Sequence, residues 1–71
     1  MKSDEELLKA IGNNIRKFRN ERKISQQELA DVTNIAKSTV QRIESGKLNP
    51  TIVMLNNISI SLDIKLEELI K

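Results

Sequence analysis

The stretch SQQELADVTNIAKSTVQRIESG, residues 25–46, constrains the fold most, because it holds two short helical patterns almost back to back. Ser25 and Glu28 have the Ser-x-x-Glu spacing of a capping box and stand directly before an apolar run. In such a box the serine side chain and the glutamate side chain satisfy free amides at a helix start. A short helix is therefore predicted over residues 26–33.

The second half of this stretch predicts another short helix after a tight turn. Asn34 is one of the few residues other than glycine that tolerates the left-handed conformation closing such a turn. A helix over residues 36–45 follows, with Val40 and Ile43 pointing inward and Gly46 just after its last turn. Two short helices joined in this way are typical of a helix-turn-helix.

Helical patterns also flank this pair. Ser3 and Glu6 repeat the capping-box spacing, and apolar residues then recur every three or four positions, so a helix is predicted over about residues 4–22, with Gly12 as a weak point. Asn49 and Pro50 break the chain. Two further helices are predicted over residues 51–62, with Ile52, Leu55, Ile58 and Leu62 on one face, and over residues 66–70. The whole chain, residues 1–71, is thus predicted to be a single all-α domain.

Composition excludes several classes of protein. The chain has 71 residues and contains neither cysteine nor histidine, so disulfides and thiolate metal sites are excluded. It has no apolar run long enough to span a membrane and no signal-peptide pattern, which favours a cytoplasmic location. Acid–base chemistry would fall to carboxylates and lysines, and no such pair looks secluded. We therefore expect no enzyme, no metal, no cofactor and no small-molecule effector.

Charge is unevenly distributed along the chain. Residues 16–47 hold eight Lys and Arg side chains against four Asp and Glu, whereas the net charge of the chain is only +2. A basic middle indicates a polyanionic partner that meets one face of the protein. On charge alone, a solvated helix surface explains the pattern equally well.

Four motifs resemble those of the lambdoid phage repressor and Cro family, also called the XRE family. They are Ser-Gln-x-Glu-Leu-Ala at 25–30, Ser-Thr-Val-x-x-Ile-Glu-x-Gly at 38–46, Asn-Pro-Thr at 49–51 and Leu-x-Glu-Leu-Ile at 66–70. The resemblance covers roughly residues 11–70 and implies a five-helix lambda-repressor-like DNA-binding domain with a central helix-turn-helix. One departure is Ala36, where a Ser or Thr often caps the second helix of the motif.

The resemblance implies which side chains would meet double-stranded DNA. Base edges would be read from the helix over residues 36–45 by Lys37, Ser38, Gln41 and Arg42, whose spacing places them on one stripe opposite Val40. Backbone phosphates would be bound by Gln26, Gln27, Thr39, Lys47 and Asn49. For Gln27, a role as a plain solvent-facing residue is equally open.

Two further groups of residues are expected to have structural roles, the first by resemblance to the family. Arg19 and Glu44 match a helix 1 arginine and an acid at the end of the recognition helix that form an ion pair. Apolar residues of the last third suggest a dimer interface, because exposed apolar patches often mark interfaces. These residues are Val53, Met54, Ile60, Ile64 and Leu66, and the alternative is that the fifth helix covers them.

These features favour one function over two others. The leading hypothesis is a transcriptional regulator that binds a pseudo-palindromic operator as a homodimer. Its stand-alone size resembles restriction-modification controller proteins, Cro-like phage regulators and small plasmid or transposon repressors. The alternative is an antitoxin or a protein-interaction module built on the same fold, and an enzyme ranks last.

Overall fold

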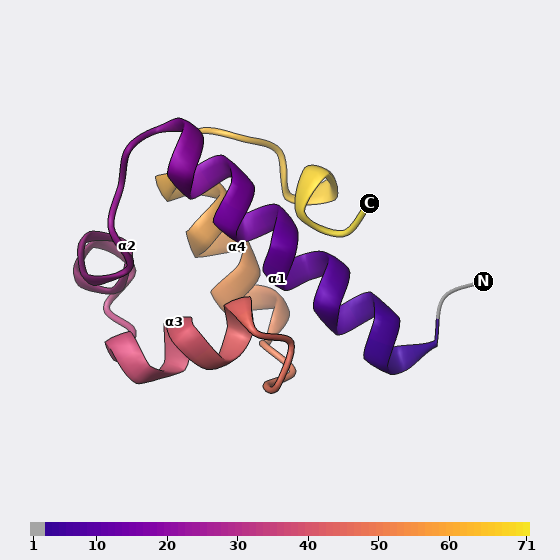
Figure 1. Ribbon diagram of the computed structural model, residues 1–71. Helices are drawn as coiled ribbons and strands as arrows, with labels where there is room; N and C mark the ends of the chain where they lie inside the picture. Colours follow the sequence, from indigo (N-terminus) through magenta and orange to yellow (C-terminus); the bar gives the residue numbers. More distant parts are fainter. Residues whose placement is uncertain (1–2) are drawn as a thin grey trace.

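Four α-helices and one short 3-10 helix make up the protein in a computed structural model that describes residues 3–71 (Figure 1). In chain order they are α1 (Asp4–Glu21), α2 (Gln26–Thr33), α3 (Lys37–Glu44), α4 (Ile52–Ser61) and the 3-10 helix η1 (Leu66–Leu69). Residues 3–71 contain no strand. The all-α prediction is confirmed, and the predicted fifth helix is a single 3-10 turn.

Side-chain caps explain where the helices begin. The Ser3 and Thr51 hydroxyls accept hydrogen bonds from the amides of Glu6 and Met54, at 3.2 and 3.1 Å. At α2 the full capping box is present: Ser25 Oγ accepts from the Glu28 amide, and Glu28 Oε1 accepts from the Ser25 amide, both at 3.0 Å. The predicted range of α2 matches the observed one, and the other ranges extend one residue beyond the observed helices at one or both ends because they included flanking cap residues.

Left-handed residues close the turns between helices. Asn34, with φ 57° and ψ 40°, ends α2 as the sequence predicts. Lys23 and Asp63 adopt the same region after α1 and α4, with φ of 56° and 55°. Such a conformation costs a residue other than glycine about 1–2 kcal/mol. Packing of the flanking helices must offset that cost at Lys23 and Asp63.

The helices enclose one small core. In Figure 1, α1 runs across the molecule in front of α4, α2 lies at the left and is seen end on, and α3 lies along the lower edge. Every α-helix contributes apolar side chains to the interior. The buried apolar residues are Ile11, Ile15, Leu29, Ala30, Val40, Ile43, Leu55, Ile58, Leu62 and Leu69. Asn14 Nδ2 donates to the Leu69 carbonyl at 2.9 Å, which fastens η1 to α1.

Ile52, expected on the same face of α4 as Leu55, Ile58 and Leu62, does not join them in the core. Its side chain is 63% exposed, whereas Leu55, Ile58 and Leu62 are buried. Ile52 is the first residue of α4 and lies one turn before Leu55, the first buried residue of that helix.

Gly12 is no weak point of α1 but the place where α1 and α3 touch. A Cβ at Gly12 would lie 2.4 Å from the Glu44 carbonyl oxygen and 2.6 Å from that of Ile43. Both neighbours are backbone atoms at the end of α3, so they cannot yield as a flexible side chain would. Only glycine allows the two helices to come this close.

We expect Gly12→Ala to destabilise the protein. In an exposed helix this change stabilises by about 1 kcal/mol, but here the added methyl group must push α3 away, and overpacking of this kind costs about 1–3 kcal/mol. Urea unfolding followed by circular dichroism measures the difference. Asn13→Ala, at the neighbouring exposed position, is the control and should change stability by no more than about 0.5 kcal/mol. A stabilised Gly12→Ala variant would contradict the proposed contact.

Candidate nucleic-acid interface

The two faces of α3 differ sharply in chemistry. Val40 and Ile43 are each 1% exposed and pack in the core. The opposite face carries Lys37, Ser38, Gln41 and Arg42, all exposed. Together they present ammonium, hydroxyl, amide and guanidinium groups on one stripe of a helix, the groups that can hydrogen-bond base edges in a DNA major groove.

The residues expected to bind phosphates lie on and around α3, and they differ in exposure and in the hydrogen bonds that they already make. Lys47 and Asn49 are exposed in the segment after α3, where Gly46 adopts φ 76° and turns the chain. Thr39 is half-buried in the first turns of α3. The Gln27 amide donates to Asp31 Oδ1 at 2.9 Å along α2. That bond fits the plain solvent-facing role for Gln27.

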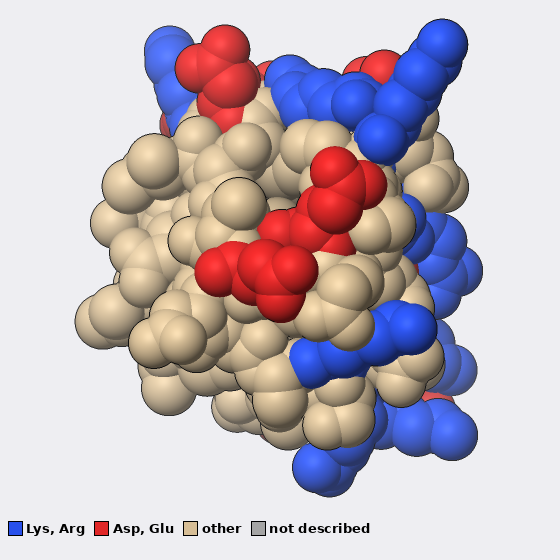
Figure 2. All heavy atoms as spheres, turned by 90° about the vertical axis from the view of Figure 1, so that its left-hand side faces the viewer, with Lys and Arg blue, Asp and Glu red and all other residues tan. Residues whose placement is uncertain are grey.

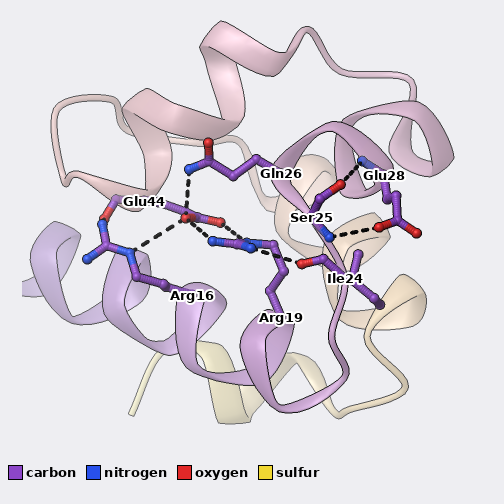
Figure 3. A network of polar contacts seen from close by, with 7 residues as sticks. All are labelled: Arg16, Arg19, Ile24, Ser25, Gln26, Glu28 and Glu44. Carbon is purple, nitrogen blue, oxygen red and sulfur yellow. Dashed lines mark hydrogen bonds and ion pairs between the residues drawn. The ribbon is translucent and has the colours of Figure 1, made fainter.

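A buried carboxylate joins three helices behind this surface. The Glu44 side chain is fully buried at the last residue of α3. Arg19 of α1 binds it in a two-pronged arrangement, with Nε 2.8 Å from Oε2 and Nη2 3.1 Å from Oε1, and donates a third bond to the Ile24 carbonyl at 2.9 Å (Figure 3). The ion pair expected between Arg19 and Glu44 is therefore present.

Arg16 and Gln26 complete this network, and sequence reasoning missed both. Gln26 Nε2 donates to Glu44 Oε1 at 3.1 Å, and Arg16 Nε lies 3.6 Å from the same oxygen (Figure 3). Arg16 Nη2 also donates to the Glu44 backbone carbonyl at 3.2 Å. The signal for Arg16 was its position three residues before Arg19, on the same face of α1. Gln26 is expected to bind a phosphate. One hydrogen of its side-chain amide is donated to Glu44, and the other remains available as a donor.

Charge is separated on the surface. Seen from the side of α2, acidic side chains gather over the middle of the face, basic side chains line its right-hand and lower margins, and both signs occur along its top edge (Figure 2). Glu28 and Asp31 are the exposed acids of α2. A polyanion would therefore meet the protein along α1 and α3 and avoid the outer face of α2.

Three aliphatic side chains of α4 are exposed, and we call this set the α4 apolar patch. Ile52, Val53 and Ile60 are 63%, 64% and 68% exposed. Met54, Ile64 and Leu66, also expected at an interface, are instead partly buried and pack against the core. Of the residues expected at an interface, Val53 and Ile60 are therefore the exposed ones, and Ile52 on the same helix is exposed as well.

Other kinds of site find no support in the part of the chain that the structure describes. Within residues 3–71, no His, Cys, Asp and Glu side chains gather in a group that can hold a metal ion. None of the helices in this range is long and apolar enough to cross a membrane.

The fold and the exposed stripe of α3 define a helix-turn-helix protein, with α2 and α3 as the two helices of the motif. A family model described as helix-turn-helix matches residues 15–69. The chain belongs to this family, which is of the XRE type.

Solved structures with the same fold include regulators of several kinds. The restriction-modification controller protein C.AhdI from Aeromonas hydrophila is 31% identical, with a TM-score of 0.85 over 87% of this chain and 94% of that one. The master regulator for biofilm formation SinR, solved in complex with DNA, is 35% identical, with a TM-score of 0.82 over 86% of this chain and 98% of that one.

A helix-turn-helix transcriptional regulator from Vibrio cholerae is 27% identical, with a TM-score of 0.87 over 94% of this chain and 38% of its own length. No curated protein sequence matches the chain.

Removing the Glu44 carboxylate should destabilise the fold strongly. In Glu44→Ala, Arg19 would remain as a largely buried cation without its partner, and breaking a buried pair from one side costs about 3–5 kcal/mol. Urea unfolding checks this. Glu21→Ala removes an exposed carboxylate of α1 and should stay within about 0.5 kcal/mol. Equal stabilities for the two variants would show that Glu44 does not hold the helices together.

Proposed function

We propose that the protein is a sequence-specific DNA-binding transcriptional regulator that binds a pseudo-palindromic operator as a homodimer, with α3 in the major groove. The observation that carries the proposal is the exposed stripe of Lys37, Ser38, Gln41 and Arg42 on the second helix of a helix-turn-helix. In this motif the second helix enters the major groove. The likeness to SinR, whose structure contains DNA, supports double-stranded DNA as the partner.

Each side chain of the stripe suits a particular base edge. Lys37 and Arg42 can donate to O6 and N7 of guanine, Gln41 can pair with N6 and N7 of adenine, and Ser38 can bond with either kind of base. The rigid attachment of α3 through Glu44 and Gly12 supports this role, because base recognition requires a fixed helix angle.

Phosphate contacts would fix the register of the protein on the duplex. Lys47, Asn49 and Thr39 flank the stripe and point donors toward the DNA backbone in this proposal. Gln26 keeps one amide hydrogen and lies in the first turn of α2, where free backbone amides favour an anion. Gln27 can bind a phosphate only if its side-chain amide gives up the hydrogen bond to Asp31.

The α4 apolar patch is the proposed dimer contact. Exposed aliphatic side chains at this density in a small domain often mark an interface. A two-fold dimer would place two copies of α3 in successive major grooves, about 10 base pairs apart or a multiple of that. In this proposal the protein is a small controller-type regulator that binds double-stranded DNA in the cytoplasm. The match to C.AhdI over most of both chains supports it.

The same patch supports the alternative function. If a different protein covers Ile52, Val53 and Ile60, the domain is an antitoxin or a protein-interaction module. Salt-dependent binding to DNA separates the two functions, since only the regulator requires it.

Substitutions in the stripe should change sequence preference. Lys37→Ala and Gln41→Ala should each lose about 1–3 kcal/mol of discrimination at particular base pairs. Selection of binding sites from random DNA, followed by affinity measurements on single-base variants of the selected site, gives these values. Unchanged preferences in both variants would mean that other residues read the bases.

Lys47→Ala should weaken binding to all duplexes about equally. A lysine that neutralises one phosphate contributes about 0.9 to the slope of log affinity against log salt concentration, so the slope should fall by that amount. Fluorescence anisotropy over a range of salt concentrations measures it. If Lys47→Ala altered base preference and left the salt slope unchanged, Lys47 would belong to the base-reading set.

Charges placed on the α4 apolar patch should separate the dimer. The double variant Val53→Asp/Ile60→Asp should sediment as a folded monomer, because burying two carboxylates without partners is unfavourable. The control is Val32→Asp, which changes a side chain on α2 that is equally exposed, at 68%, and it should leave the dimer intact. Analytical ultracentrifugation gives both masses, and an unchanged dimer in the double variant would place the interface elsewhere.

A further inference from the structure

An open polar pocket of about 210 Å³ lies between α1 and the end of α3, and none of the base-reading residues lines it. Three of its side chains come from one face of α1, where residues spaced by four and three positions lie in line. The lining residues are Lys9, Asn13, Arg16, Glu44 and Ser45. One water takes about 30 Å³ in the liquid, so a larger polar group fits here.

The pocket offers hydrogen-bond donors and positive charge. The side-chain amide of Asn13 has no hydrogen-bond partner among residues 3–71. The Arg16 side chain is 48% exposed although it contacts Glu44. Lys9 is 61% exposed and lies 3.3 Å from Glu5, itself 78% exposed. Exposed pairs of this kind are weak, so Lys9 can exchange Glu5 for another anion.

The pocket is lined by one carboxylate, that of Glu44, and its charge is already balanced by neighbouring residues, so it would repel a bound anion only weakly. Glu44 is fully buried, and Arg19, Gln26 and Arg16 surround its two oxygens. The Ser45 hydroxyl is turned away toward the Arg42 carbonyl, to which it donates at 3.1 Å. The group that fits is therefore an oxyanion held by Lys9, Asn13 and Arg16.

We propose that this pocket binds a phosphate of the DNA backbone. Its place in the fold identifies the source of the phosphate. Arg16 shares Glu44 Oε1 with Gln26, and Ser45 is two residues before Lys47. The pocket lining is thus joined to Gln26 through Glu44 and to Lys47 through the chain, and both of these residues are proposed above to bind phosphates. The inference rests on the DNA-binding function proposed above and adds a contact that helix-turn-helix spacing alone does not predict.

Two variants test the pocket in the 71-residue chain. Asn13→Asp keeps the shape of an exposed side chain and adds a negative charge where the phosphate would lie. It should weaken binding to every duplex by about fivefold at moderate salt. Lys9→Gln removes one cation and should lower the slope of log affinity against log salt concentration by about 0.9. Neither residue contributes to the core, so folding is checked by thermal unfolding and should be unchanged.

Lys65→Gln is the matched control, because it removes the same charge from an exposed position just before η1, outside the pocket. Its salt slope should equal that of the unmodified protein. If Asn13→Asp and Lys9→Gln bind DNA like the unmodified protein, the pocket proposal is wrong while the DNA-binding function stands. If the unmodified protein shows no salt-dependent affinity for any duplex, both proposals fail.

The side-chain amide signals of Asn13 distinguish the two sources of phosphate. In ¹⁵N-labelled protein these signals should shift on titration with a DNA duplex and stay unchanged with inorganic phosphate at the same phosphate concentration. A shift with inorganic phosphate and none with DNA would overturn the assignment to the DNA backbone.

Discussion

The buried carboxylate of Glu44 is the interaction on which the rest of the structure depends. It ends α3, and two arginines of α1 and a glutamine of α2 hold it, so one side chain fixes the angle of α3 against both neighbouring helices. A buried ion pair adds little net stability compared with an apolar contact of similar size, but losing one partner is costly. We therefore interpret the network as a device that selects one orientation of α3, and the apolar core as the source of stability.

The importance of that network follows from how short α3 is. Isolated helices of eight residues are unstable in water, and Ala36 provides no side-chain cap at the start of α3. Its order must come from packing of Val40 and Ile43 and from its C-terminal end. Gly12 contributes there, since it lets the α1 backbone approach the last carbonyls of α3. The end of α3 is thus anchored, and the beginning, which would enter the groove first, carries no contact of this kind.

The sequence predicted those features that depend on neighbouring residues. Caps at Ser3 and Ser25, the left-handed turn at Asn34 and the inward face of α3 all follow from local chemistry, and family resemblance indicated the pair of Arg19 and Glu44. The sequence did not predict the features that depend on how closely two helices approach each other. Gly12 looked like a defect because its contact is 32 positions away, and Arg16 and Gln26 looked like surface residues. Ile52 has the helical spacing of Leu55 and Ile58 but is the first residue of α4, one turn before the first buried residue of that helix.

The two outward surfaces of the domain share one core, since α4 packs on α2 and α2 packs on α3. α4 contributes Leu55 and Ile58 to the interior and exposes Ile52, Val53 and Ile60 on the other side, while α3 contributes Val40 and Ile43 and exposes its polar stripe. In the proposed dimer, contact through α4 would therefore set the distance and angle between the two copies of α3 without a flexible segment between them. Half-site spacing in the operator would then be a property of core packing, so substitutions at buried positions such as Leu55 would alter spacing preference even though they touch no DNA.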